Sequence, residues 1–208
     1  SGTIEPVLRS LSDAGLEYVI HDRVNSEPTL AHVTESLALF QTSGSDVLVA
    51  CGGGSPMDVA KAVSAMAANQ GSIRDYMGYD KIPLPGPPII AVPTTAGTGS
   101  EATIVTIITD TERDVKMLIT SPWLLAAVAI ADPLLTLGMP KGITAATGLD
   151  ALTHAIEAYV SRQAQPMTDV LALQAVKLIH QNLPVSCAGP AHLPARSNPP
   201  LGPFLAGL

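Results

Sequence analysis

Residues 46–69, DVLVACGGGSPMDVAKAVSAMAAN, are the most informative about the fold class. Its apolar run Asp46–Cys51 predicts a buried strand, which stops at three glycines, Gly52–Gly54. Pro56 then opens a predicted helix, Met57–Asn69, because proline is favoured in the first turn of a helix. A strand, a glycine turn and a helix make up the unit that α/β proteins repeat. The stretch therefore predicts a strand–helix sheet.

The flanking sequence continues this alternation up to about Pro140 and then becomes helical. We predict strands at Glu17–His21, Ile89–Val92 and Leu125–Ala131, a hairpin of Thr103–Thr109 with Val115–Ile119, and helices at Thr29–Thr42, Lys141–Val160 and Met167–Leu183. Proline density breaks regular structure after that. We therefore predict a doubly wound α/β domain over 1–140, the start of a helical domain over 141–184, and a proline-rich irregular tail over 185–208.

Charge and cysteine content exclude several classes of partner. The net charge is −7 and no run of Lys or Arg occurs, which disfavours nucleic acid and anionic membranes. The longest apolar run, Trp123–Ala131, is about half of the ~20 residues that a membrane helix needs. Two cysteines without a C-x-x-C pair favour free thiols in a reducing compartment. We expect a soluble cytoplasmic protein with no nucleic-acid or membrane partner.

Two polar loops follow predicted strands. Glycines in Gly52–Asp58 allow a close backbone approach, and the helix that follows offers free N–H groups to a phosphate. Pro93–Glu101 carries four hydroxyls and two glycines after the next strand. Each loop alone is also typical of an ordinary turn whose hydroxyls bond their own backbone. Together they favour a ligand site, because open α/β sheets bind ligands beyond the carboxyl ends of their strands.

Asp150 and His154 form a third constellation. They are four residues apart in a predicted helix, so their side chains share one face. A carboxylate and an imidazole together suit Fe(II) or Zn(II). A single histidine on a helix is more often packed or exposed than a ligand, and a catalytic metal needs at least three protein ligands. The pair therefore predicts an incomplete metal site.

Three segments, in this order, closely resemble the iron-dependent (group III) alcohol dehydrogenase family. They are GGGSPMDVAK (52–61), PTTAGTGSE (93–101) and MPKGITAATGLDALTHAIEAYVS (139–161). The resemblance covers roughly residues 1–184 and leaves the proline-rich tail outside. It implies a Rossmann-like dinucleotide-binding domain followed by the beginning of an all-helical domain, with the chain truncated at both ends and the first strand of the sheet missing.

The resemblance implies roles for individual residues. Those that match the family's cofactor-binding positions are Gly53, Gly54, Ser55 and Asp58 at the pyrophosphate of NAD or NADP, Thr94, Thr95 and Thr98 in the cofactor cleft, and Lys116. Asp150 and His154 match the first two of four metal ligands, with Fe(II) expected and Zn(II) as the alternative. No catalytic residue beyond the metal site is implied.

This sequence departs from the family pattern at several positions. The other two family ligands are histidines on later helices, and neither His180 nor His192 matches them. The acidic residue that helps to choose between NAD and NADP would precede Ser1. Glu27 stands before Pro28, where family members often carry asparagine.

The activity that the resemblance implies is hydride transfer between a metal-bound alcohol or aldehyde and NAD(P). The partners implied are a small alcohol or aldehyde substrate and, in intact relatives, a second copy in a homodimer. We expect this form of the chain to be inactive or impaired. Two alternatives stay open: a non-catalytic remnant of the fold, and a relative of the zinc-dependent polyol dehydrogenases that share the architecture.

Overall fold

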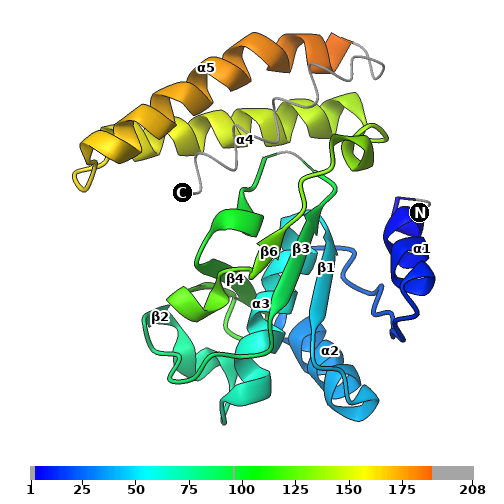
Figure 1. The fold of residues 1–208 in the computed structure, drawn as a ribbon. Coiled ribbons are helices and arrows are strands. Elements are labelled where there is room, and N and C mark those ends of the chain that lie inside the picture. Colours follow the sequence, from blue (N-terminus) through cyan, green and yellow to red (C-terminus); the bar gives the residue numbers. More distant parts are fainter. Residues whose placement is uncertain (1–2, 96, 189–208) are drawn as a thin grey trace. The chain divides into compact units, whose positions relative to one another are not determined.

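The computed structural model describes residues 3–95 and 97–188, in which strands and helices alternate before two long helices (Figure 1). The α-helices are α1 (Glu5–Asp13), α2 (Leu30–Ser43), α3 (Gly54–Ala68), α4 (Lys141–Val160) and α5 (Pro166–Ala188). The strands are β1 (Leu48–Gly52), β2 (Gly78–Tyr79), β3 (Ile89–Pro93), β4 (Val105–Asp110), β5 (Val115–Thr120) and β6 (Val128–Ala129). The predicted α/β fold class is confirmed.

The chain divides into two compact units. Unit 1 contains Ser1–Cys51, Ser55–Ala91 and Ile104–Val128, and unit 2 contains Gly52–Gly54, Val92–Thr103 and Ala129–Leu208. Strands β1, β3 and β6 each run from the first unit into the second. The glycine turn after β1 and the polar loop after β3 therefore belong to the same unit as α4 and α5.

One three-stranded sheet has the order β1-β3-β6. Its first two strands run parallel, because the Leu48 N–H donates to the Pro88 carbonyl at 3.0 Å and, further along both strands, the Thr94 N–H donates to the Gly52 carbonyl at 2.8 Å. The predicted strand at Leu125–Ala131 is reduced to the two residues of β6. Short 3₁₀-helices at Pro122–Leu124 and Pro133–Thr136 bound the segment, and just before β6 the Ala127 N–H still donates to the Ile89 carbonyl at 2.9 Å.

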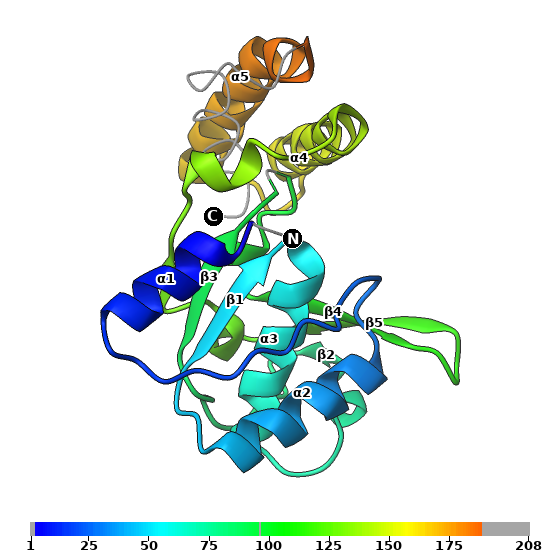
Figure 2. The same cartoon turned by 90° about the vertical axis from the view of Figure 1, so that its right-hand side faces the viewer.

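The second sheet has the order β2-β5-β4 and contains the predicted hairpin. Strands β4 and β5 are antiparallel, with Ile107 opposite Leu118 and Asp110 opposite Val115 at the turn end, and they extend as a two-stranded ribbon (Figure 2). Side chains alternate between the two faces of the ribbon, so Ile108 is buried whereas Ile107 is 40% exposed. The prediction of this hairpin is confirmed.

Helix α3 forms the centre of unit 1. It begins at Gly54, three residues before the predicted start, and places Pro56 in the first turn, where a backbone N–H has no helical partner to lose. Most of its length is buried. The apolar core around it consists of Val33, Val59, Ala62, Val63, Ala65, Met66, Ile73, Ile82, Ile108, Met117, Ile119 and Leu124. The buried Lys61 is satisfied, because its Nζ donates to the Val105 carbonyl at 2.8 Å.

The predicted strand at Glu17–His21 is wrong. In the described chain this segment follows α1 and has no regular secondary structure, and Tyr18, Val19 and Ile20 are 42–51% exposed. A β-rich run becomes a strand only when another strand pairs with it. The helix predicted next is present as α2, where the Thr29 hydroxyl accepts from the His32 N–H and caps the first turn.

Helices α4 and α5 pack side by side in unit 2 (Figure 1). Buried residues, most of them small, recur at helical spacing on both helices: Thr144, Gly148, Ala151 and Ala155 on α4, and Ala172, Ala175, Ile179 and Ser186 on α5. Helix α4 has the predicted bounds. Helix α5 continues through Pro184 to Ala188, although the irregular tail was predicted to start at Val185; burial of Ser186 at 1% exposure accompanies this extra turn.

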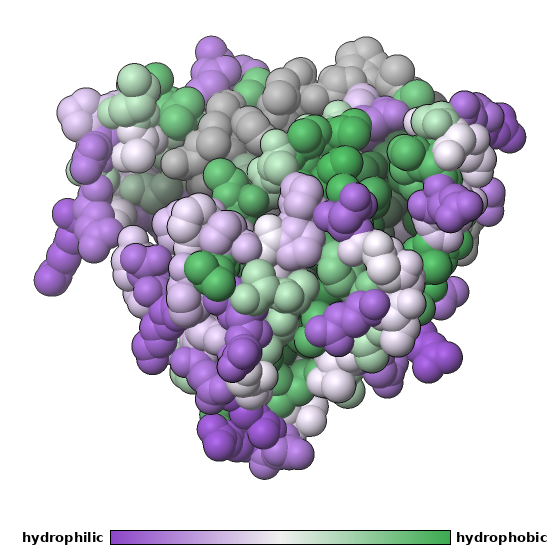
Figure 3. All heavy atoms as spheres, turned by 60° about the horizontal axis from the view of Figure 1, so that its bottom comes forward, coloured by the Kyte–Doolittle hydropathy of each residue, from purple (hydrophilic) through white to green (hydrophobic). Residues whose placement is uncertain are grey.

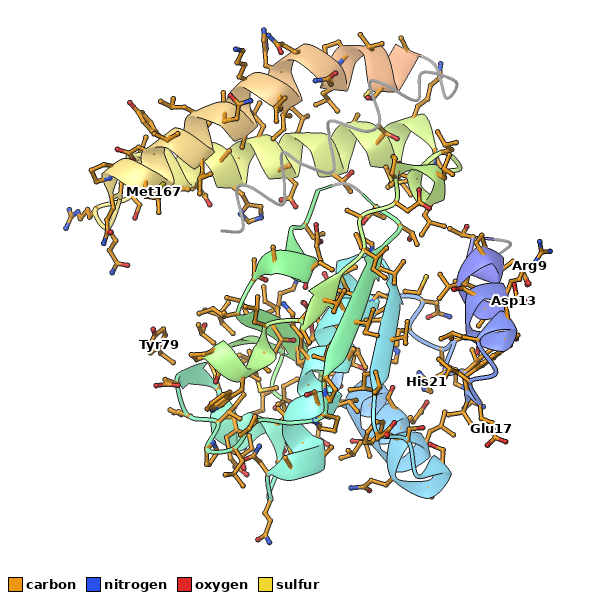
Figure 4. All side chains as sticks on the ribbon, in the orientation of Figure 1. Arg9, Asp13, Glu17, His21, Tyr79 and Met167 are labelled. Carbon is orange, nitrogen blue, oxygen red and sulfur yellow. The ribbon has the colours of Figure 1, made fainter. Side chains whose placement is uncertain are left out.

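The surface mixes hydrophilic and hydrophobic side chains, as Figure 3 shows for one face. Tyr79 and Met167 are 74% and 73% exposed and point outward (Figure 4). Within the described residues, no helix combines the length and hydropathy needed to cross a bilayer.

Candidate functional site

The glycine turn has the geometry of an anion site. Strand β1 ends at Gly52, whose φ of 152° lies in the range that favours glycine, and α3 starts two residues later at Gly54. The N–H groups of the first turn of a 15-residue helix are therefore presented directly after the strand. Free N–H groups and the positive end of the helix dipole can bind a phosphate.

The threonine loop after β3 lies against this turn. A Cβ atom added at Gly53 would meet the Thr95 hydroxyl oxygen at 3.2 Å, and one added at Gly54 would meet the Thr98 methyl at 3.0 Å. Both glycines thus leave room for a threonine side chain. The structure brings together four of the predicted cofactor-binding residues in unit 2, and Thr94 joins them through its N–H bond to the Gly52 carbonyl.

Part of the threonine loop forms hydrogen bonds with its own backbone. The Thr98 hydroxyl accepts from the Ser100 N–H at 3.4 Å, which is the behaviour of an ordinary Ser/Thr-rich turn. Ser100 and Glu101, both 6% exposed, anchor the end of the loop. At least the Thr98 hydroxyl is therefore engaged within the loop.

Ser55, Asp58 and Lys116 fall in unit 1. Asp58 ties α3 to β4: its carboxylate accepts from the Ile107 N–H at 3.2 Å, and its carbonyl accepts from the Thr106 hydroxyl at 2.8 Å. The family resemblance predicted that this carboxylate faces the pyrophosphate. The structure shows its contact with the Ile107 N–H, which no sequence motif indicates.

Lys116 also has a partner. Its Nζ donates to Glu27 Oε1 at 2.7 Å, and each side chain is 63% exposed. Because both ends are in solvent, the pair contributes little stability. The pair places the Glu27 carboxylate beside the Lys116 ammonium group, which was predicted to contact the cofactor.

Cys51 lies at the end of β1, directly before the glycine turn. Burial raises the pKa of its thiol, which keeps the sulfur protonated. A protonated, partly buried thiol is a poor nucleophile and a poor metal ligand.

Asp150 and His154 point from one face of α4. Their Oδ1 and Nε2 atoms are 3.7 Å apart, and the side chains are 51% and 52% exposed. Two donors at about 2.1 Å from a tetrahedral cation lie about 3.4 Å apart, so the pair fits a shared cation after a small adjustment. The His154 Nδ1 atom also lies 3.9 Å from a Glu157 oxygen, so an ordinary helix-surface ion pair is the competing description.

The described residues, 3–95 and 97–188, contain no group of three or more His, Cys, Asp or Glu side chains that could hold a metal. His180 is exposed on α5, as expected for a residue outside the ligand pattern. His192 lies outside the described residues. Asp150 and His154 therefore offer two donors, and a stable divalent site needs more from elsewhere.

The comparisons with known proteins decide the family. The sequence model described as "Iron-containing alcohol dehydrogenase" matches residues 1–133, and the one described as "Fe-containing alcohol dehydrogenase family, C-terminal" matches residues 144–208. The chain belongs to the iron-containing alcohol dehydrogenase family. The second match runs through the proline-rich segment, so ending the resemblance at Pro184 was wrong.

Relatives in this family match the whole chain with about half of their own length. The 1,3-propanediol dehydrogenase of Klebsiella pneumoniae is 44% identical over 207 residues, covering 100% of this chain and 54% of the relative. A crystal structure of a 1,3-propanediol oxidoreductase superposes with a TM-score of 0.97 at 43% identity, covering 100% of this chain and 54% of that one. Sulfoacetaldehyde reductase from Bifidobacterium kashiwanohense, solved in complex with NAD+, superposes with a TM-score of 0.91 at 38% identity, covering 99% and 55%.

Sequence reasoning missed two participants in this arrangement. Gly97 was quoted only as part of the loop, and Thr147 only as part of the helix motif, yet a Cβ atom at Gly97 would lie 2.4 Å from the Thr147 carbonyl oxygen. The repeated glycines of the loop were the available signal, since glycine often marks a close backbone approach.

Proposed function

We propose that this chain supplies the dinucleotide-binding part and two cation ligands of an NAD(P)-dependent oxidoreductase for small alcohols and aldehydes. The observation that carries the proposal is the packing in unit 2 of the glycine turn against the threonine loop, in a chain whose α4 presents Asp150 and His154 as a pair. The names of the relatives, all dehydrogenases or reductases of small alcohols or aldehydes, support the substrate class.

The chain's own residues bind and orient. The N–H groups at the start of α3 take the pyrophosphate of the dinucleotide, and the Thr94 and Thr95 hydroxyls offer hydrogen bonds beside it. Asp150 and His154 hold a divalent cation, with Fe(II) supported by the family and Zn(II) as the alternative. When bound, the cation supplies Lewis-acid chemistry and the nicotinamide supplies hydride transfer.

We further propose that the 208-residue chain alone turns over poorly. Two donors on one exposed helix face bind a divalent cation weakly, because a stable catalytic site needs at least three protein ligands. Among the described residues, no group of three or more His, Cys, Asp or Glu side chains has an arrangement that could hold a metal, which supports this part of the proposal and favours a non-catalytic remnant as the second candidate. The two candidates make the same prediction for nucleotide binding and differ in turnover.

We also propose NAD as the dinucleotide, a homodimer as the assembly and the cytoplasm as the location. The relative solved with NAD+ supports NAD over NADP as the dinucleotide. Free Cys51 and Cys187 support a reducing compartment. The family resemblance favours a homodimer, which sedimentation of the chain at several concentrations tests.

Titration of the purified chain with NADH, followed by nicotinamide fluorescence, tests the binding part. Thr95→Val removes the hydroxyl while keeping the shape, and we expect it to weaken NADH binding by about tenfold, which is the cost of one hydrogen bond to a charged group. Thr42→Val is the matched control, because Thr42 is exposed on α2 and bonds only its own helix. If the wild-type protein gives no fluorescence change with NADH, the proposal that this chain binds a dinucleotide is wrong.

Assay of the same chain with Fe(II), NADH and a small aldehyde tests the turnover part. We expect a rate at least a hundredfold below the ~10 s⁻¹ that is typical of enzymes. A rate near that typical value would contradict the proposal that the chain alone turns over poorly, but it would agree with the proposed oxidoreductase activity. NADH binding with no measurable turnover at any metal concentration favours the remnant.

A further inference from the structure

Gly97 lies against the backbone of α4. A Cβ atom at this position would be 2.4 Å from both the Cβ and the carbonyl oxygen of Thr147, and 2.8 Å from its carbonyl carbon. Real Cβ atoms essentially never approach other atoms below 3.0 Å. The loop and the helix therefore touch backbone to backbone, and only glycine permits this separation.

This contact is the last of three in a row. Gly53 accommodates Thr95, Gly54 accommodates Thr98, and Gly97 of the same loop accommodates Thr147. All of these residues belong to unit 2. The glycine turn is thus joined to the threonine loop by close contacts that an added methyl group would crowd, and the threonine loop is joined to α4 at Gly97 by a contact that leaves no space for one.

Thr147 is aligned with the cation ligands. On a helix, residues three and seven positions further along lie on the same face, and these are Asp150 and His154. A displacement of α4 at Thr147 therefore displaces the turns that carry both donors. A helix backbone moves as a rigid element over two turns, since its hydrogen bonds are internal.

We propose that Gly97 is a positioning residue that couples the threonine loop to helix α4, so that dinucleotide binding and cation binding strengthen each other. The inference rests on the proposed function. The dinucleotide orders the threonine loop that carries Gly97, and the cation orders the helix that carries Thr147. Whichever ligand binds second therefore finds the Gly97–Thr147 contact already ordered. Coupling of this kind is reciprocal, so each ligand raises the affinity of the other by the same factor.

The test measures NADH affinity with and without Zn²⁺ in the 208-residue chain. Zn²⁺ is the probe because it is redox-inert. In wild-type protein we expect saturating Zn²⁺ to tighten NADH binding by about tenfold, within the usual range of coupling between sites. His154→Ala should abolish this increase, which separates the Asp150/His154 pair from other zinc-binding histidines.

Gly97→Ala should reduce the coupling factor to about one while NADH alone still binds. Gly142→Ala is the matched control: Gly142 is on the same helix, and nothing lies within 4 Å of its added Cβ. We expect it to keep the wild-type coupling. Wild-type coupling in Gly97→Ala, or a wild-type protein that binds both ligands independently, would overturn the inference.

Amide hydrogen exchange without any ligand provides a second readout. In Gly97→Ala we expect faster exchange in residues 97–103 and at the start of α4, with unchanged exchange in α3. This measurement distinguishes the two proposals, because failure of NADH to bind at all contradicts the function, whereas unchanged exchange contradicts the contact. If Gly97→Ala does not fold, Gly54→Ala takes its place, and Thr98→Ser, which removes the clashing methyl, should restore its coupling.

Discussion

Lys116 and Glu27 form an ion pair between strand β5 and the segment before α2, with 2.7 Å between Nζ and Oε1. Lys116 was predicted to contact a dinucleotide, and the carboxylate of Glu27 stands where family members often carry asparagine. We propose that a bound phosphate or ribose competes with Glu27 for this ammonium group, so that the Glu27 carboxylate weakens the binding of an anionic ligand there.

Glu27→Gln should tighten NADH binding to the 208-residue chain. The substitution keeps the shape of the side chain and removes its charge, which frees Lys116. Exposed ion pairs are worth up to about 1 kcal/mol, so we expect an increase in affinity of about two- to fivefold that shrinks as salt is added. Fluorescence titration measures it. Glu35→Gln, which removes an exposed carboxylate paired with Arg23 instead, should leave the affinity unchanged; equal gains in both variants would argue against a local effect.

The buried carboxylate of Asp110 predicts how stability depends on pH. Arg74 donates to both of its oxygens, at 2.7 and 2.8 Å, and this pairing lowers the pKa of Asp110. A depressed folded-state pKa stabilises the fold above the unfolded-state pKa of about 3.9, and this contribution is lost as the pH falls toward the folded-state value.

We therefore expect Asp110→Asn to lower the free energy of unfolding by a constant amount between pH 5 and 7, and by progressively less below about pH 4, where the wild-type carboxylate of the unfolded chain takes up a proton. Urea unfolding at stepped pH measures this difference. Asp46→Asn, at an exposed position, is the control. A difference from wild type that stays the same down to pH 2.5 would contradict the assigned role of Arg74.

Local pattern was enough to predict the elements whose partners are close in sequence. The hairpin and α4 follow from alternation and helical spacing within the segment itself. The error at Glu17–His21 has the opposite origin, because its apolar residues favour a strand but no strand pairs with them in the described chain. The bounds of β6 and α5 depend likewise on neighbouring elements. Pattern alone cannot supply such partners.

The site shows the same limit. Sequence placed the glycines, threonines, Asp150 and His154 by motif, and the structure groups them in unit 2. The contacts of Asp58 with β4 and of Gly97 with Thr147 join residues 49 and 50 positions apart, respectively, and neither pair carries a pattern that a sequence reveals. Close backbone approaches are set by tertiary packing, which a local sequence pattern does not encode.

Gly148→Ala should destabilise the packing of α4 on α5. A Cβ atom at Gly148 would lie 2.2 Å from a terminal carbon of Leu183, and overpacking of this kind costs about 1–3 kcal/mol. The clash is with the end of a flexible side chain, so shortening that side chain should relieve it. We expect the double variant Gly148→Ala, Leu183→Ala to lose less stability than the sum of the two single variants, as measured by thermal unfolding. Strictly additive losses would show that the two residues do not touch.

In the part of the chain that the structure describes, one side of β1 pairs with no other strand, and this predicts self-association. The run VLVAC at 47–51 reads as a strand with neighbours on both sides, yet β1 is the terminal strand of its sheet, and Val47 and Val49 are 40% and 38% exposed. A terminal strand with apolar flanks invites pairing with another chain, and lysine suppresses such pairing. We expect sedimentation to show concentration-dependent association of the 208-residue chain that Val49→Lys reduces. Leu118→Lys, at a 50% exposed position on the hairpin, should leave the association unchanged; a monomeric wild type at all concentrations would rule out both this pairing and the proposed homodimer.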